Sequence, residues 1–290
     1  MSRVSTLSRA SWSGEASDSG IDPTAVLERG DVLLFGSLRF TIEHGEAAVF
    51  TPAILGSSKN ASYDPVSGRV SGTTATGADA DALQAMLGRF SQSAQALVGD
   101  LFPSYRAHVE RGRTSFRPAE IAGRAMSWRK DDTRLHVDSF PATPSGGRRI
   151  LRVFANVNPE GRARAWRIGD DFEKVGERFV EALRLPWPGS GHLLRLLRIT
   201  KTPRSAYDAL MLQLHDRMKA DPDFQANSPQ TAVDFPAGST WIAFTDQVSH
   251  AAMAGQYQLE QTFMVPVAAM REPERSPLRI LERLKGRTLV

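Results

Sequence analysis

The sequence predicts a mainly β fold with helices, built around a double-stranded β-helix, also called a jelly roll. After Ser127, short apolar stretches bounded by Pro and Gly recur at a spacing typical of jelly rolls. A helical pattern precedes these stretches, and a second helical block interrupts them. We therefore expect a jelly-roll core at about 124–267, with a helical insertion at about 171–220.

The composition favours one globular domain and restricts its chemistry. The chain has 290 residues, of which 41% are hydrophobic and 23% charged, and this is enough apolar material for one sizeable core. It has no cysteine, which excludes a disulfide framework, a thiolate zinc site and a cysteine nucleophile. Any metal ion must therefore bind to histidines and carboxylates.

The two ends of the chain differ in pattern from its centre. Residues 1–22 are rich in Ser, Gly and Arg with little periodic hydrophobicity, so we expect a mobile tail there. We expect a single domain at 23–270. Residues 271–290 are predicted to form a polar linker and a short basic helix. The apolar side of that helix consists of Leu278, Ile280, Leu281 and Leu284.

Ahead of the core, the sequence indicates early strands and one long helix. Residues 31–50 alternate apolar and polar side chains, which favours strands. Residues 79–102 have a helical pattern that ends before Pro103. The apolar stripe of this helix consists of Leu83, Met86, Leu87, Phe90, Ala94 and Leu97.

The predicted core strands are short and the insertion between them is helical. The strands are SWRKDD (127–132), TRLHVDSF (133–140), RRILRVFANVN (148–158), RARAWRIG (162–169), STWIAFTD (239–246) and LEQTFMVPV (259–267). The helical pieces are FEKVGERFVEALRL (172–185), HLLRLLRIT (192–200) and RSAYDALMLQLHDRMKA (204–220).

Charge and hydropathy bear on the surroundings of the protein. The sequence contains no apolar run of the length that a secretory signal needs, and no window approaches the roughly 20 apolar residues of a membrane span. We therefore expect a cytoplasmic protein. The formal net charge of +4 is Arg-rich and favours an anionic partner, although an ordinary solvated surface explains it equally well.

The most specific chemical signal is His136-Val137-Asp138 in a strand-like stretch. Residues two apart in a strand project from the same face, so both side chains can reach one metal ion. His250 follows another predicted strand and is the candidate third ligand. Two histidines and one carboxylate form the facial triad of non-haem Fe(II) oxygenases. An isolated H-x-D pair often arises by chance, so the strand context and the late histidine carry this interpretation.

A 2-oxoglutarate oxygenase also needs a cation inside the barrel for the distal carboxylate of the co-substrate. Alternation along 148–158 puts Arg152, Phe154 and Asn156 on one face. If that face lines the cavity, Arg152 forms the salt bridge and Asn156 donates a hydrogen bond nearby. If the opposite face points inward, Arg149 replaces Arg152.

Four separated blocks resemble the 3-deoxy-D-manno-oct-2-ulosonic acid (Kdo) hydroxylase family over about Leu101 to Val267. They are SWRKDDTRLHVDSFP, GGRRILRVFANVNPEGRARAWRIG, RSAYDALMLQLHDRMK and DFPAGSTWIAFTDQVSHAAMAGQYQLEQTF. The resemblance implies Fe(II), 2-oxoglutarate and O₂, with ascorbate as a candidate reductant. It also implies hydroxylation at carbon 3 of the Kdo sugar in the lipid A inner core of lipopolysaccharide.

The resemblance also guides the choice of binding residues. Many related hydroxylases take the 2-oxoglutarate cation from the last barrel strand, but the corresponding stretch here, 259–262, has no Arg or Lys. This departure favours Arg152 and leaves Gln261 as an auxiliary contact. For the substrate, whose groups are anionic, we expect Arg129, Lys130 and Trp166 to contribute.

The implied substrate is a Kdo-containing lipid A precursor, and two stretches could touch an anionic membrane. These stretches, 193–204 and 278–287, combine Leu with Arg and Lys, as interfacial helices do, although helix packing is the commoner explanation. The protein would then be cytoplasmic and peripheral on the inner membrane. We expect no nucleic-acid partner.

Two alternatives remain open at this stage. One is a 2-oxoglutarate-dependent hydroxylase of a protein side chain or another small molecule, because the triad alone does not choose the substrate. The other is a non-catalytic, cupin-like sugar-binding protein, in which the same barrel would bind an anionic sugar without turnover.

Overall fold

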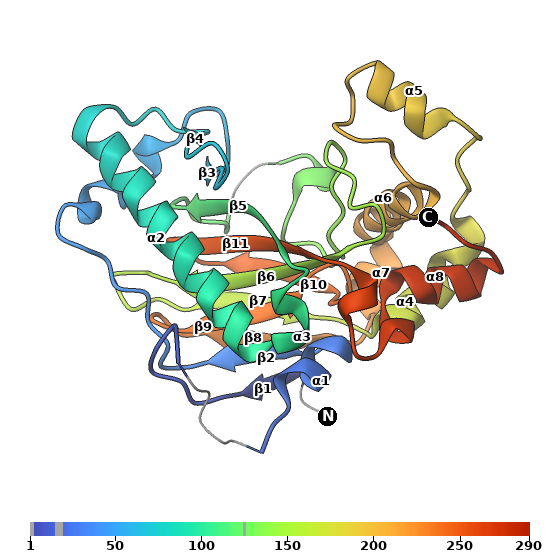
Figure 1. Cartoon of the computed structure of the whole chain (residues 1–290), viewed down its shortest axis with the longest axis horizontal. Helices are drawn as coiled ribbons and strands as arrows, with labels where there is room; N and C mark the ends of the chain where they lie inside the picture. The colour runs from blue at the N-terminus through green and yellow to red at the C-terminus, as the bar shows by residue number, and fades with distance from the viewer. Residues whose placement is uncertain (1–2, 15–19, 124–125) are drawn as a thin grey trace.

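The computed structural model describes residues 3–14, 20–123 and 126–290. Over these ranges the protein is rich in β-sheet and also contains helices, and its strands form two sheets (Figure 1). The larger sheet has eight strands in the order β1-β2-β9-β6-β11-β5-β3-β4, and the smaller has three in the order β10-β7-β8.

The strand bounds follow the order of each sheet. The larger sheet consists of β1 (Val4–Thr6), β2 (Val32–Phe35), β9 (Thr240–Phe244), β6 (Arg149–Asn156), β11 (Gln258–Val265), β5 (Glu110–Arg117), β3 (Ala61–Tyr63) and β4 (Val70–Ser71). The smaller sheet consists of β10 (His250–Ala254), β7 (Arg164–Ile168) and β8 (Thr231–Phe235). All described pairings are antiparallel except that of β1 with β2.

The helices lie outside the two sheets (Figure 1). In chain order they are α1 (Pro23–Glu28), α2 (Gly77–Leu101), α3 (Pro103–Arg106), α4 (Phe172–Phe179), α5 (Ser190–Leu196), α6 (Ala206–Ala220), α7 (Pro222–Asn227) and α8 (Pro277–Lys285). None of the helices in the described ranges is both long enough and apolar enough to cross a membrane.

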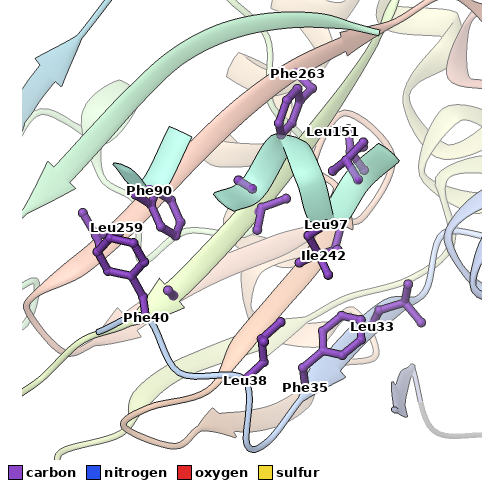
Figure 2. Packing of buried hydrophobic residues seen from close by; sticks show 14 of the residues in the cluster. Leu33, Phe35, Leu38, Phe40, Phe90, Leu97, Leu151, Ile242, Leu259 and Phe263 are labelled. Atoms are coloured by element: carbon purple, nitrogen blue, oxygen red, sulfur yellow. The ribbon is translucent and has the colours of Figure 1, made fainter. Parts of the chain in front are cut away.

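Helix α2 covers one face of the larger sheet. Its residues Phe90 and Leu97 are fully buried in the main hydrophobic core. Figure 2 shows them beside Leu151 of β6 and beside Leu259 and Phe263 of β11. Burying each of these large side chains stabilises the fold by about 1.5–3 kcal/mol. This face of the sheet is therefore used for packing.

The opposite face of the larger sheet points toward the smaller sheet. Because side chains alternate along a strand, Arg152 and Phe154 of β6 lie on the face opposite Leu151. Phe154 contacts Trp166 of β7 edge to face, with ring centroids 5.2 Å apart. The space between the two sheets is thus lined by the Arg152 face of β6, which was one of the two arrangements that the sequence left open.

Helices α4, α6 and α7, which lie between β7 and β8, form a second core with the C-terminal helix. Val175 of α4, Leu214 of α6, Phe224 of α7 and Leu281 of α8 are all buried there. Helix α6 begins with a capping box in which the Ser205 hydroxyl and the carboxylate at its third position bind each other's backbone. The insertion is therefore a packed part of the molecule.

One side chain of the insertion binds the segment that leads into His136. The amide oxygen of Gln225 in α7 accepts a hydrogen bond from the Leu135 N–H at 2.8 Å, and its amide nitrogen donates to the Leu135 carbonyl at 2.9 Å. A side-chain amide thus makes the two bonds that a neighbouring strand would make. This contact fixes the backbone next to the candidate metal ligands.

Several elements predicted from the sequence are confirmed. Helix α2 closely matches the prediction at 79–102, and β6, β7, β9 and β11 lie in the stretches predicted as strands. Other predictions are wrong. Glu46–Val49 and Trp128–Lys130 are short 3₁₀ helices rather than strands, and the stretch 133–140 forms only an isolated bridge at His136. Strands β5, β8 and β10 were not predicted, since their alternation is irregular.

The N-terminal segment also differs from the expected mobile tail. Val4–Thr6 pairs with β2 as β1, and the buried Arg9 side chain forms an ion pair with Asp100 at 3.0 Å. The segment has few apolar side chains, but backbone pairing and one buried cation hold it in place. Part of the expected tail lies outside the described residues. The division into 1–22, 23–270 and 271–290 stays a prediction.

A buried ion pair at the start of β6 should dominate local stability. Arg149 and Asp246 are almost fully buried, with Nε and Oδ2 2.8 Å apart, and Arg149 also lies over the Phe244 ring. We expect Arg149→Met to lower the free energy of unfolding by about 3–5 kcal/mol, because Asp246 is left as an uncompensated buried charge. Urea unfolding measures this.

The double variant Arg149→Met/Asp246→Leu supplies the contrast. It should recover part of the loss, because it removes both charges. Arg106→Met, at an exposed position, should change stability by no more than about 0.5 kcal/mol. If the double variant is destabilised by the sum of both single losses, the ion pair is not the cause.

Candidate metal centre

The centre begins with two backbone segments that pair at one point. The His136 N–H donates to the His250 carbonyl at 3.0 Å, and the His250 N–H donates to the His136 carbonyl at 2.9 Å. Through this single bridge the His136 segment lies next to β10, at the edge of the smaller sheet. The bridge sets the two imidazole rings side by side, with centroids 4.7 Å apart.

Each histidine is oriented by a hydrogen bond to the backbone. Nδ1 of His136 lies 2.7 Å from the Arg134 carbonyl, and Nδ1 of His250 lies 2.8 Å from the Val248 carbonyl. Because a carbonyl oxygen only accepts, each Nδ1 carries the proton and donates it. Each Nε2 is therefore left with a free lone pair, which is the arrangement of a metal-ligating histidine.

Asp138 adds a carboxylate to the two nitrogen ligands. Its N–H donates to the Thr245 carbonyl at 2.8 Å, which fixes the turn after His136. One ligand atom from each of His136, Asp138 and His250 lies within 4.8 Å of the others. The Asp138 Oδ2 atom is buried and accepts no hydrogen bond from the described residues. A divalent cation fits this donor set.

The local electrostatics keep the three groups in their ligating forms. Burial, followed by the neighbouring His250, holds the pKa of His136 well below its usual value, and burial likewise lowers the pKa of His250. Burial alone would raise the pKa of Asp138, but Arg152 and the two histidines hold it well below its usual value. At neutral pH the imidazoles are uncharged and the carboxylate is ionised.

Aromatic rings hold the histidines from the outside. Trp166 of β7 stacks on His250 with ring centroids 5.0 Å apart at 22°. His215 of α6 meets His136 edge to face at 5.3 Å. The smaller sheet and the helical insertion thus both support the centre, which limits the rotation of the ligands.

Three buried or partly buried arginines, from β5, β6 and β7, lie in the interior around the centre, and Arg152 contacts a candidate ligand directly. Nη1 of Arg152 lies 3.3 Å from Asp138 and 3.0 Å from Glu260 of β11. Arg117 of β5 contacts the other oxygen of Glu260 at 3.1 Å, as well as Asp132 at 3.3 Å. Both cations are therefore neutralised by carboxylates of the protein itself.

The third arginine, Arg164 of β7, forms no ion pair with a carboxylate within the part of the chain that the structure describes. It is almost fully buried, its Nη1 donates to the Gly255 carbonyl at 2.6 Å, and its Nε has no partner among the described residues. Burial, and then the charge of Arg117, lower the pKa of Arg164 to about 9. The carboxylates of Asp132, Glu120 and Glu260 oppose this shift, but none of them forms an ion pair with Arg164, so an anion from outside the chain would stabilise the buried guanidinium further.

A cavity of about 530 Å³ opens beside Arg152. It is lined by the charged residues Arg117, Arg152 and Glu260 and also by Phe140 and Pro141. The full set of charged lining residues is Asp64, Arg111, Arg113, Arg117, Arg148, Arg152, Lys201 and Glu260. Six cations face two carboxylates, so the cavity favours an anionic ligand.

Comparison with known proteins agrees with this geometry. A family model described as 3-deoxy-D-manno-oct-2-ulosonic acid (Kdo) hydroxylase matches residues 12–288. The chain belongs to the Kdo hydroxylase family. No curated protein sequence matches it.

Solved structures of the Kdo hydroxylase KdoO are similar to this family member over almost the whole chain. KdoO is described as a non-haem Fe(II) α-ketoglutarate-dependent dioxygenase, and α-ketoglutarate is another name for 2-oxoglutarate. Its complex with α-ketoglutarate and Fe(III) has 47% identity and a TM-score of 0.94, covering 99% of this chain and 97% of KdoO. The cobalt(II) complex of KdoO has 47% sequence identity and a TM-score of 0.95. The complex with succinate and Fe(III) has 46% identity and a TM-score of 0.94, and both cover 99% of this chain and 97% of KdoO.

Asn156 and Gln261, which the sequence suggested as contacts of the 2-oxoglutarate co-substrate, make other contacts in the structure. The Asn156 amide donates to the carbonyls of Arg162 and Phe235 at 2.9 and 3.0 Å, so it is engaged by backbone. Gln261 accepts from Thr114 at 2.6 Å and lies on the α2 side of β11. Alternation along β11 turns Glu260, not Gln261, toward Arg152.

Of the three residues expected to bind the Kdo substrate, one is buried and two are exposed. Trp166 lies next to His250 in the interior. Arg129 and Lys130 are exposed on the 3₁₀ helix Trp128–Lys130, where Arg129 stacks on Trp128 and pairs with Asp216 at 3.1 Å. Neither lines the cavity described above. Apart from Arg152, the charged residues that do line it are not among the predicted contacts, because exposed and inward-facing arginines look alike in a single chain.

The ligand geometry predicts the effect of removing each ligand. We expect Asp138→Ala and His250→Ala to weaken Co(II) binding by more than 100-fold, because each removes a direct ligand, whereas loss of an outer contact typically weakens binding by about 10–100-fold. The visible absorption of bound Co(II) measures this.

A histidine far from the centre provides the matched control. His108 is exposed next to the start of β5, so His108→Ala should bind Co(II) like the unaltered protein. Unchanged Co(II) affinity in both ligand variants would show that the metal binds elsewhere.

Proposed function

We propose that this chain is an Fe(II)/2-oxoglutarate-dependent dioxygenase that hydroxylates carbon 3 of the Kdo sugar in the lipid A inner core. The observation that carries the proposal is the set of His136, Asp138 and His250 beside a cation-lined cavity. The likeness to KdoO supports the same reaction class. The substrate is then a Kdo-containing lipid A precursor.

We also infer that the two sheets form a double-stranded β-helix. From β5 to β11 the chain alternates between the two sheets, except that the consecutive strands β7 and β8 both belong to the smaller one. Strands β5, β6, β9 and β11 belong to the larger sheet, while the His136 segment, β7, β8 and β10 belong to the smaller. Such alternation is what a jelly roll requires. In this fold the ligands project into the space between the sheets.

Iron would be held by Nε2 of His136, Nε2 of His250 and the carboxylate of Asp138. When bound, iron together with 2-oxoglutarate and O₂ supplies the oxidising power for hydroxylating an unactivated C–H bond. The protein side chains have a different task. Trp166 and the buried strands exclude water from one side of the centre, and the cavity orients the sugar from the other.

The distal carboxylate of 2-oxoglutarate needs a buried cation. The sequence favours Arg152 for this role, but Arg152 already pairs with Asp138 and Glu260. Arg164 lacks a carboxylate partner among the described residues and lies two positions from Trp166 on the same face of β7. Both observations support Arg164 as the co-substrate cation.

Arg117 and Arg152 are then available for the substrate. Both line the open cavity, and Glu260 holds them close together. Kdo carries a carboxylate that can accept paired hydrogen bonds from guanidinium groups. The exposed Arg129 and Lys130 stay predicted contacts for more distant anionic groups of the lipid.

A lipid-linked substrate also bears on where the enzyme works. Such a substrate is held in a membrane, so the enzyme must reach the surface of that membrane. We infer that the protein acts from the cytoplasm, in peripheral contact with the inner membrane. The cations that line the cavity suit the anionic groups present at such a surface.

The proposed reaction makes a direct prediction. With Fe(II), 2-oxoglutarate, ascorbate as reductant and Kdo-linked lipid A precursor, we expect equal amounts of succinate and of product heavier by one oxygen atom. Mass spectrometry and succinate assay measure both. Asp138→Ala should abolish both products, and a chain that binds the lipid without releasing succinate would be a sugar-binding protein instead.

The assignment of the two arginines predicts a separation of effects. Arg164→Gln should raise the KM for 2-oxoglutarate about 30-fold or more, because loss of one partner of a buried charge pair costs about 2 kcal/mol or more. Arg152→Gln should mainly raise the KM for the Kdo substrate. Succinate formation at varied concentrations of each substrate measures both, and the reverse pattern would return the co-substrate to Arg152.

A further inference from the structure

Exposed apolar side chains gather on one projection of the molecule. In the segment 184–204, which contains α5, Trp187 is 83% exposed and Leu196 is 78% exposed. The large apolar residues of this projection that are exposed are Leu185, Trp187, Leu193, Leu196, Leu197 and Ile199. Figure 1 shows α5 standing away from the two sheets and from the other helices. Leaving this much apolar surface in water is unfavourable unless another surface covers it.

The same segment carries only positive charge. Arg184, Arg195, Arg198, Lys201 and Arg204 lie within it, and no Asp or Glu occurs between Glu181 and Asp208. The spacing of Leu193, Leu196 and the C-cap residue Leu197 puts them on one face of α5. Arg195 lies in the last turn of the helix, and Arg198 follows its C-cap. This combination matches a surface that is apolar at depth and anionic at its boundary.

We propose that this projection, residues 184–204, docks the enzyme on an anionic phospholipid bilayer. Trp187 and the leucines of α5 enter the headgroup boundary, and the flanking arginines contact lipid phosphates. A protein partner would need acidic groups placed opposite the five cations, whereas an anionic membrane presents negative charge over its whole surface.

The other basic apolar stretch, 278–287, behaves differently and serves as an internal comparison. In α8 the residues Leu278, Ile280 and Leu281 are buried in the second core against α4 and α6. Helix packing therefore accounts for α8. It does not account for α5, whose leucines contact no such core.

The projection is joined directly to the rim of the cavity. The Lys201 N–H donates to the Ala142 carbonyl at 3.0 Å, and Arg204 donates to the Pro141 carbonyl at 2.6 Å. Lys201, Pro141 and Ala142 all line the cavity. A bilayer that holds α5 thus lies next to the cavity mouth. The inference builds on the proposed lipid-linked substrate, but docking itself requires no turnover.

Vesicle binding tests the proposal without any substrate. The full chain is sedimented with vesicles of phosphatidylcholine alone or with added phosphatidylglycerol, and we expect binding only to the anionic vesicles. Arg195→Gln/Arg198→Gln should weaken binding about 25-fold, since each cation near the surface contributes about fivefold. Leu196→Ser/Leu197→Ser should weaken it at least about tenfold.

Matched variants outside the projection control for charge and apolar area. Arg29→Gln/Arg106→Gln removes two exposed cations, and Val290→Ser removes one exposed apolar side chain. Both should bind like the unaltered chain. Brominated lipids should quench the fluorescence of the unaltered chain, and Trp187→Phe should lose that quenching while keeping its thermal midpoint.

The outcomes separate docking from catalysis. With acyl-free Kdo sugar as substrate, Leu196→Ser/Leu197→Ser should keep its kcat/KM, and with Kdo lipid in vesicles it should lose about tenfold. Absent vesicle binding, or equal binding by both projection variants, overturns the proposal even if the hydroxylase is active. Self-association that the leucine variant abolishes, without vesicle binding, also overturns it and makes the projection an interface between copies.

Discussion

The reciprocal backbone pair between His136 and His250 is the constraint on which the rest of the centre depends. It joins two segments that are distant in sequence, and it does so at the residues whose side chains carry the chemistry. Because the backbone is fixed at this point, each ring needs only one further bond to be oriented. The carbonyls of Arg134 and Val248 supply these bonds from within the same two segments.

The buried charges around this centre differ in how fully they are paired. Asp138 is balanced by Arg152, and Glu260 links Arg152 to Arg117. Arg164 is left with backbone alone. Arg164 is thus a buried cation without a close ion pair among the described residues, and an incoming dicarboxylate can relieve its desolvation cost. Binding of the co-substrate and stability of the interior are linked in this way.

The parts of the site that could be predicted are those with a local pattern. The H-x-D spacing predicts two ligands that reach one ion although the segment forms only a single bridge, and the alternation of β6 separates Arg152 from Leu151. The roles of Asn156 and Gln261 could not be judged so well. Asn156 binds the carbonyls of Arg162, in the loop after β6, and of Phe235, at the end of β8, and Gln261 faces α2 because of the register between β11 and β6. Register and loop contacts are tertiary properties that one strand does not encode.

The fold shows the same division between local and long-range information. Helix α2 was predictable because its apolar stripe repeats over many turns, whereas the sequence of β10, HAAMA, shows no alternation of apolar and polar residues. The 3₁₀ helix Trp128–Lys130 lies in a polar stretch whose pattern fits a strand equally well. In such stretches the contacts of the folded chain decide the backbone conformation.

The two bonds from Gln225 to Leu135 have a consequence for how the molecule behaves in a crowded solution. The segment before His136 lies beyond β10 at the border of the smaller sheet, where an unpaired N–H and carbonyl would offer a template for a strand of another chain. A side-chain amide from α7 occupies both groups. The helical insertion therefore prevents another chain from pairing with the segment that presents the metal ligands.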